Sequence, residues 1–81
     1  MLILSPQALA TYLKDEREKQ KLSQTQLAER VGLRQKTMSD FENSPHKTRI
    51  ETIFKILAAL NQQIHVTKTE GSQTPSWKEE W

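Results

Sequence analysis

The stretch SQTQLAERVGLRQKTMSDFEN, residues 23–43, decides the fold of this chain. Its apolar residues recur at helical spacing on both sides of Gly32. Ser23 stands three residues before Gln26, which is the spacing of a capping box that opens a helix. Gly32 permits the positive φ that a tight turn requires. The stretch therefore predicts two short helices joined by a glycine turn, which is the helix-turn-helix arrangement.

Small and large apolar residues alternate here as two crossing helices require. Ala28 is small enough for the second helix to pass close by, and the large residues tie both helices to a core. The positions that fit, in chain order, are Leu27, Ala28, Val31, Gly32, Leu33, Met38 and Phe41. An ordinary helical hairpin is the alternative, but it does not require all seven positions together. The pattern favours the helix-turn-helix.

Helices are predicted on both sides of this stretch. Ser5 and Pro6 form a helix start, because serine caps free amides and proline fits the first turn. The charged residues 14–19 that follow are interpreted as a solvated helix face. After the turn SPHK, Thr48 and Glu51 have capping-box spacing ahead of another helix. The apolar face expected to close the core there consists of Ile50, Ile53, Phe54, Leu57 and Leu60.

Residues 63–67 change the period of the pattern from helix to strand. Ile64 and Val66 alternate with polar residues, but a strand this short does not stand alone. The only other candidate strand is MLIL at residues 1–4. Pairing between two copies of the chain is the economical solution. We therefore expect an all-α bundle of four to five helices with one short strand that pairs across a homodimer.

The length of 81 residues suits one small domain with a tail. We expect residues 1–67 to form the domain and residues 68–81, rich in Gly, Ser, Thr, Pro and charge, to be a flexible tail. No apolar run is long enough to span a membrane, and no secretory signal is recognisable, so an intracellular protein is expected. Between residues 14 and 49, Lys and Arg outnumber Asp and Glu nine to six, which weakly favours an anionic partner.

Motifs for catalysis and metal binding are missing from the sequence. The chain has no cysteine, and its two glycines form neither a phosphate-binding loop nor a nucleophile elbow. His46 and His65 lack further ligands at metal-binding spacing. We therefore expect neither an enzyme nor a cofactor.

The chain resembles the helix-turn-helix family of phage Cro and repressor proteins over residues 5–61. More narrowly, it is similar to the HipB antitoxins of HipA–HipB toxin–antitoxin pairs. The residues that carry this closer resemblance are SPQALA before the first helix, LRQKTMSDFEN followed by a loop with proline, FKILAAL in the last helix, and a polar tail that ends in EEW.

The resemblance implies a bacterial cytoplasmic repressor, associated with the nucleoid through its DNA. Such a homodimer binds a palindromic operator of its own operon and also neutralises a HipA-like Ser/Thr kinase toxin. The third helix would read base edges in the major groove, because Gln matches adenine and Arg or Lys matches guanine. The implied reading residues are Arg34, Gln35, Lys36 and Ser39. Family members have smaller residues at the position of Lys36, so a phosphate contact is the alternative there.

Phosphate contacts are implied at the start of the second helix and around the loop after the third. They would fix the register of the protein on DNA without reading sequence. The implied residues are Gln24, Thr37, Asn43, Lys47 and Thr48. Simple capping by Gln24 and Thr48, and solvation of Lys47, are the alternatives.

Both tryptophans of the chain, Trp77 and Trp81, lie in the tail PSWKEEW. Tryptophan is a favoured anchor in protein interfaces, so we expect this tail, and Trp81 above all, to contact the toxin. A fraying tail, or packing of the tail within the dimer, is the alternative. Two other functions are considered. One is a stand-alone phage-type repressor without a toxin, and the other is a protein-interaction adaptor built on a helix-turn-helix. The polar, basic face of the third helix argues against the adaptor.

Overall fold

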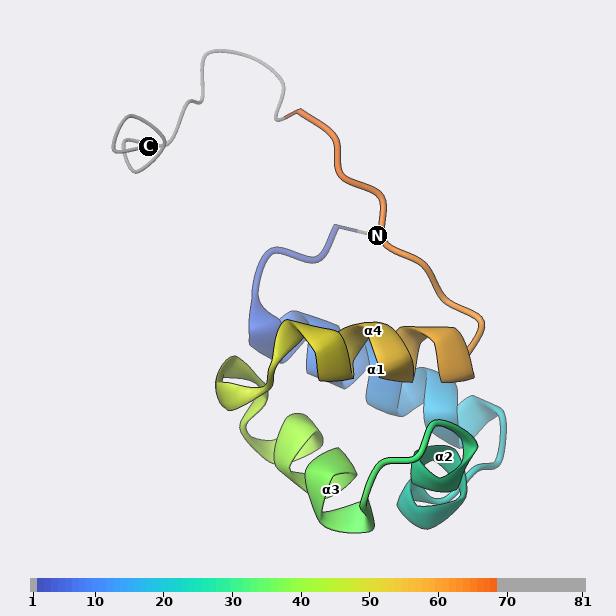
Figure 1. Cartoon of the computed structure of the whole chain (residues 1–81). Coiled ribbons are helices and arrows are strands. Elements are labelled where there is room, and N and C mark those ends of the chain that lie inside the picture. The colour runs from blue at the N-terminus through green and yellow to red at the C-terminus, as the bar shows by residue number, and fades with distance from the viewer. Residues whose placement is uncertain (1, 69–81) are drawn as a thin grey trace.

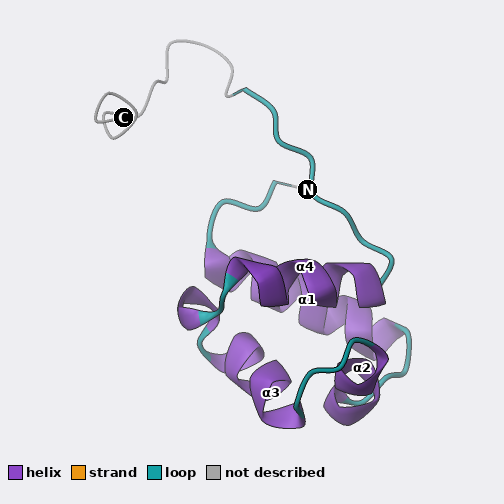
Figure 2. Cartoon of the chain, viewed as in Figure 1, coloured by secondary structure: helices purple, strands orange, loops and turns teal. Residues whose placement is uncertain are grey.

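The computed structural model describes residues 2–68, and their regular structure is entirely helical (Figures 1 and 2). The elements are α1 (Pro6–Lys19), α2 (Gln24–Arg30), α3 (Gln35–Asn43), the short 3-10 turn η1 (Pro45–Lys47) and α4 (Ile50–Ala59). Helix α4 lies in front of α1, and α2 and α3 lie below them in Figure 1. The predicted all-α bundle with a helix-turn-helix is confirmed.

The first two predicted helix starts are formed by the residues expected. The Ser5 hydroxyl accepts a hydrogen bond from the Ala8 amide at 3.0 Å. Ser23 and Gln26 form the complete capping box, with the Gln26 amide donating to the Ser23 hydroxyl at 3.0 Å and the Ser23 amide donating to Gln26 Oε1 at 2.8 Å. Two of the free amides at the start of α2 or just before it are thereby satisfied.

The start of α4 differs from the prediction. The cap position is Arg49 rather than Thr48, and no side chain caps this helix. The Thr48 amide is bound to the Pro45 carbonyl at 3.0 Å, so Thr48 closes η1. Because the Thr48 amide is bonded within the proline turn, it is not available for the predicted capping box with Glu51. The cap of α4 therefore lies one residue later, at Arg49.

The turn between α2 and α3 depends on Gly32, whose φ of +70° is in the left-handed region that glycine adopts without strain. The chain then folds back so that the Leu33 amide donates to the Ala28 carbonyl at 2.9 Å. This bond fixes the direction in which α3 leaves the turn. The predicted role of Gly32 is confirmed.

The core lies where α2, α3 and α4 meet α1. The sequence pattern predicts the core residues of α2 and α3. Of the two predicted residues in the turn, Leu33 is partly buried against the core, and Val31 is partly buried. The buried apolar residues are Ala10, Leu13, Leu27, Ala28, Met38, Phe41, Ile56, Leu57 and Leu60. Burial of one such large side chain contributes about 1.5–3 kcal/mol, so this set holds the four helices together.

The apolar face of α4 is divided between two directions. Leu57 and Leu60 are buried as predicted, but Ile50 and Phe54 are 69% and 52% exposed, so the prediction that they close the core is wrong. Ile56, which was not predicted, is fully buried in their place. Helix α4 has more apolar circumference than its neighbours cover, and the remainder faces outward.

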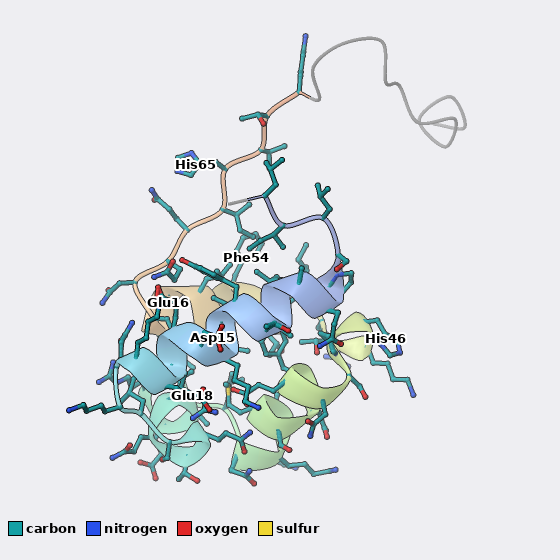
Figure 3. All side chains as sticks on the ribbon, turned by 180° about the vertical axis from the view of Figure 1, so that it is seen from behind. Asp15, Glu16, Glu18, His46, Phe54 and His65 are labelled. Carbon is teal, nitrogen blue, oxygen red and sulfur yellow. The ribbon has the colours of Figure 1, made fainter. Side chains whose placement is uncertain are left out.

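Both described ends of the chain leave the helices on the side where Phe54 lies (Figure 3). Leu2, Leu4, Ile64 and Val66 are exposed in these ends, with exposed fractions from 46% to 92%. Together with Ile50 and Phe54 they are called the apolar end face below. Several large apolar side chains left exposed in one small domain point to an interface.

Residues 62–68 follow α4 without forming a helix or a strand. Their path is anchored where the Tyr12 hydroxyl donates to Gln62 Oε1 at 2.8 Å. A strand that pairs only with a second copy has no ladder to join in one chain. The predicted pairing at residues 63–67 stays a prediction, as does a domain boundary near residue 67. None of the helices within residues 2–68 is long and apolar enough to cross a membrane.

Candidate nucleic-acid interface

Helix α3 lies at the end of the molecule opposite to the side where both described ends of the chain leave the helices (Figure 1). Met38 and Phe41 turn one side of this helix into the core. The four residues predicted to read bases stay outside: Arg34, Gln35 and Lys36 are exposed, and Ser39 is half-buried. A single helix face that is polar and well anchored is the geometry with which a protein enters the major groove.

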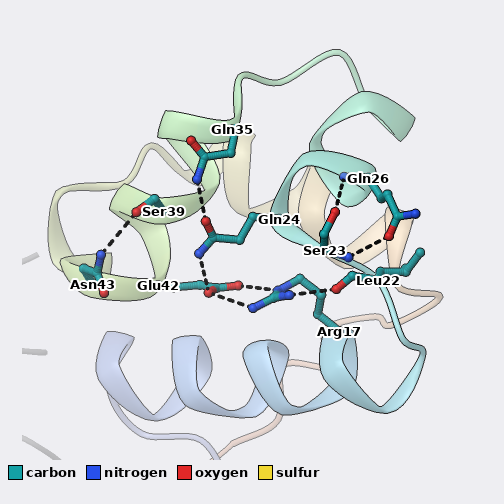
Figure 4. Close-up of polar contacts among 9 residues, drawn as sticks. All are labelled: Arg17, Leu22, Ser23, Gln24, Gln26, Gln35, Ser39, Glu42 and Asn43. Carbon is teal, nitrogen blue, oxygen red and sulfur yellow. Dashed lines mark hydrogen bonds and ion pairs between the residues drawn. The ribbon is translucent and has the colours of Figure 1, made fainter.

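Two of the predicted reading residues have local partners along α3. The Lys36 ammonium lies 3.7 Å from the Asp40 carboxylate, one turn further, and both groups are largely exposed. Exposed pairs of this kind contribute little energy, so the ammonium remains available to an anion. The Ser39 hydroxyl accepts a hydrogen bond from Asn43 Nδ2 at 3.2 Å, which couples a predicted reading residue to a predicted phosphate ligand (Figure 4).

Gln24 and Gln35 are in direct contact, although they belong to different helices. Gln35 Nε2 donates to Gln24 Oε1 at 2.6 Å (Figure 4). Each residue is the first of its helix, α2 and α3 respectively. The turn thus brings together one residue predicted to hold phosphate and one predicted to read a base. The sequence indicates the role of each residue separately but not their contact.

Gln24 is in turn attached to a buried ion pair. Its Nε2 donates to Glu42 Oε1 at 2.9 Å. Glu42 also accepts from Arg17, whose Nε lies 2.8 Å from Glu42 Oε2 and whose Nη2 lies 3.2 Å from Glu42 Oε1. The remaining Arg17 nitrogen, Nη1, donates to the Leu22 carbonyl at 2.7 Å. All three guanidinium nitrogens of Arg17 and both carboxylate oxygens of Glu42 are therefore hydrogen-bonded.

The interpretation of Arg17 as part of a solvated charged face is wrong. Its side chain is 10% exposed and that of Glu42 is 4% exposed. Arg17 follows Ala10 and Leu13 at helical spacing, so it continues the buried stripe of α1. That spacing is a signal that sequence reasoning can use. A charge on an apolar stripe must find a partner inside the fold.

A polar hollow lies beside α3 where η1 leads into α4. Three predicted phosphate ligands line it, namely Thr37, Lys47 and Thr48. Ser44, Arg49 and Thr52 line it as well and were not predicted. Leu33 and the acidic Asp40 complete the lining, so the hydroxyls and the two cations suit an anion such as a DNA phosphate on the side of the hollow away from Asp40. The signal for the missed residues is weak, because only the tertiary structure brings the start of α4 next to α3.

The fold agrees with comparisons to known proteins. The sequence profile of the helix-turn-helix family matches residues 13–65. The antitoxin HipB of Escherichia coli is 33% identical over 78 residues, which cover 96% of this chain and 89% of that protein. The chain belongs to the HipB family of helix-turn-helix proteins.

The chain is also similar to HipB chains in solved complexes and to a phage protein. HipB in a complex described as HipA-HipB-O2-O3 superposes with a TM-score of 0.83 and 37% identity, covering 86% of this chain and 99% of that one. HipB bound to an O4 20-mer gives a TM-score of 0.82 at 36% identity, with the same coverage. The ImmF control region 10 kDa protein of Bacillus phage phi105 is 29% identical over 66 residues, covering 82% of this chain and 73% of that protein.

The other residues singled out in the sequence of this HipB-family chain belong to η1, to the segment after α4 or to the part of the chain outside the described residues. Ile64 and Val66, predicted to mediate dimerisation, are exposed in the segment after α4. His46 is exposed in η1. His65 is exposed as well, and its Nε2 lies 3.0 Å from Gln63 Nε2. Trp77 and Trp81, predicted to contact the toxin, lie outside the described residues.

Proposed function

We propose that this chain is the antitoxin of a HipA–HipB-type pair. As a homodimer it represses its own operon by binding a palindromic operator, and it binds and neutralises a HipA-like kinase. The observation that carries this proposal is the polar face of α3 on a fold that matches HipB in operator complexes over 86% of the chain. No catalytic activity is assigned to the chain itself, since the kinase activity belongs to the partner.

The DNA contacts divide by chemistry. Arg34, Gln35, Lys36 and Ser39 form the base-reading set, because they extend from the exposed side of a helix whose other side is fixed in the core. The phosphate-binding set consists of Gln24, Thr37, Asn43, Lys47 and Thr48. The grouping of Thr37, Lys47 and Thr48 around one hollow supports this second set.

The apolar end face supports dimerisation. Six large apolar side chains are exposed there, and both described ends of the chain leave the helices on the side opposite α3 (Figure 1). Two copies joined through this face, with Ile64 and Val66 in paired strands, leave α3 of each copy uncovered. Such a dimer would read two half-sites about one helical turn, or a multiple of it, apart.

The experiment is a co-purification followed by a DNA-binding assay. The tagged chain is expressed with a HipA-like kinase, and the complex is analysed by size-exclusion chromatography. The chain alone is then tested on duplexes from the upstream region of its own operon, at several salt concentrations. A stable complex and saturable binding to one duplex over its scrambled version are expected. Failure to bind any duplex in preference to its scrambled version would remove the repressor function.

A stand-alone repressor is the second candidate, and the similarity to the phage phi105 protein favours it. The two candidates agree on the DNA interface and differ only in the toxin. A chain that binds its operator but forms no complex with a HipA-like kinase would establish the stand-alone repressor. An interaction adaptor remains disfavoured, because α3 exposes polar side chains instead of apolar anchors.

A further inference from the structure

Four side chains form one continuous line of hydrogen bonds from α1 to the exposed face of α3 (Figure 4). Arg17 donates to Glu42, Gln24 donates to Glu42, and Gln35 donates to Gln24. The exposed end of this line is Gln35, and its inner end is the buried Arg17–Glu42 pair. The two hydrogen bonds that link the side chains of Glu42, Gln24 and Gln35 are called the amide relay below.

The amide relay has a direction, and the chemistry of Glu42 fixes it. A carboxylate only accepts hydrogen bonds, and a glutamine amide has a donor nitrogen on one side and an acceptor oxygen on the other. Gln24 must therefore turn its nitrogen toward Glu42, which leaves its oxygen toward Gln35. Gln35 must therefore donate its own Nε2 hydrogen to Gln24 Oε1. Each amide is oriented by the one before it.

The direction determines what Gln35 offers to a ligand. One hydrogen of its Nε2 is taken by Gln24. Its Oε1 and the other Nε2 hydrogen remain for a base edge. An acceptor beside a donor matches adenine, which presents the N6 donor beside the N7 acceptor. Guanine presents two acceptors, O6 and N7, and does not match this arrangement.

Reversing the relay would reverse this preference. If Gln24 turned its oxygen inward, its nitrogen would face Gln35 and would draw Gln35 Oε1 toward itself. Gln35 would then present mainly its donor nitrogen, which suits the guanine acceptors. Arg17 holds Glu42 through two of its nitrogens and so keeps the acceptor in place. We propose that Glu42, acting through Gln24, sets the direction of the amide relay and so makes Gln35 a reader of adenine.

Glu42 is a positioning residue in this proposal, since its side chain is 4% exposed and acts through its hydrogen bond with Gln24. The proposal rests on the DNA-binding function and adds a determinant of specificity to it. Glutamine at position 42 is nearly the same size, but it offers either an oxygen or a nitrogen to Gln24. Both directions of the relay then become accessible, and the preference for adenine over guanine should weaken without a new contact to DNA.

The test uses the full-length dimer and a pool of duplexes randomised over both half-sites. Bound duplexes are sequenced for the wild type and for the Gln35→Ala variant, and the base pair whose preference disappears in that variant is the one that Gln35 reads. The wild type is expected to prefer adenine over guanine at this pair by about 10-fold or more. Glu42→Gln should reduce the ratio to below about threefold, and it should leave the other base pairs unchanged.

Two further variants separate the relay from stability. Gln24→Met removes the relay while leaving Arg17 and Glu42 paired, and it should also lose the adenine preference at the same pair. Leu57→Ala destabilises α4 away from the relay and should keep that preference. Circular dichroism establishes that each variant is folded.

The outcomes are distinct. A folded Glu42→Gln or Gln24→Met protein that still prefers adenine by the wild-type ratio would overturn the proposal. If Glu42→Gln does not fold, Gln24→Met decides alone. A wild-type protein that selects no sequence from the pool would remove the DNA-reading function itself, and this proposal would fall with it.

Discussion

Arg17 and Glu42 are separated by 25 positions in the sequence and meet at 2.8 Å beneath the helix-turn-helix. Their pair joins α1 to α3, and through Gln24 it joins α2 as well. Three helices that carry or support the DNA-binding face are thus connected at one point. A single charge left behind there would have no water to solvate it.

Removal of one partner of this pair should be costly. Arg17→Met leaves the Glu42 carboxylate buried without its cation, and we expect a loss of about 3–5 kcal/mol in the free energy of unfolding. Replacing both residues by apolar ones, as in Arg17→Met with Glu42→Leu, should recover most of the loss. Urea unfolding at one fixed protein concentration measures both effects. A single variant within about 1 kcal/mol of the wild type would contradict this account of the pair.

Gln35→Ala should weaken binding to the selected operator by about 1–3 kcal/mol, because one bidentate base contact is lost. The choice of base should relax at one pair in each half-site. Titration of labelled operator, followed by fluorescence anisotropy, gives the affinity. Gln7→Ala makes the same substitution on α1, away from α3, and serves as the matched control. A wild-type isotherm for Gln35→Ala would remove this residue from the reading set.

Lys47→Ala should weaken binding to all duplexes by a similar factor, because a phosphate contact carries no sequence information. The slope of log affinity against log salt should become shallower by about one ion. Binding is measured at four or more salt concentrations. Lys55→Ala, which removes an exposed lysine from α4, should leave the slope unchanged. An unaltered slope for Lys47→Ala would exclude its contact with phosphate.

Ile64→Pro should convert the dimer into a monomer, since proline removes an amide from the predicted strand pairing and cannot occupy the interior of a paired strand. Sedimentation velocity at several protein concentrations measures the change. Lys68→Pro lies just past the predicted strand and is the control that should remain dimeric. A dimer that persists in Ile64→Pro would show that the exposed side chains of α4 suffice for association.

Deletion of residues 76–81 should weaken toxin binding and leave operator binding unchanged. This deletion removes Trp77 and Trp81, which lie outside the described residues, and leaves the helices intact. Substituting both tryptophans by serine tests the indoles without shortening the chain. Calorimetry with the purified HipA-like kinase measures the affinity. Equal affinity of the truncated and complete chains would end the proposed role of the tail.

Local features of the fold were predictable from the sequence. Ser5, Ser23 and Gln26 form the expected caps, and Gly32 adopts the expected positive φ. These features depend on hydrogen bonds and backbone sterics that act within a few residues, so their signals lie next to each other in the sequence. The predicted cap at Thr48 is also lost to a local interaction, because the neighbouring turn η1 binds the Thr48 amide.

The sequence indicates the candidate site residues one by one but not their arrangement. Gln24 and Gln35 each carry a recognisable signal, yet their contact at 2.6 Å follows from the angle at which α2 and α3 meet. Arg17 carries a signal that is ambiguous, since a charge within a charged stretch is usually solvated. Only the position of Glu42 on α3 makes its burial favourable.

The sequence alone determined that this chain forms a helix-turn-helix with a polar third helix, because helical periodicity, caps and a glycine turn are local properties. The tertiary structure decided which side of α4 enters the core and which side is left with Ile50 and Phe54 exposed. It also decided that an ion pair from α1 and α3 would support the glutamines of the DNA-binding face. These outcomes depend on how helices that are far apart in the sequence pack against one another. The burial of a residue then depends on its packing partners and cannot be predicted from that residue and its neighbours in the sequence.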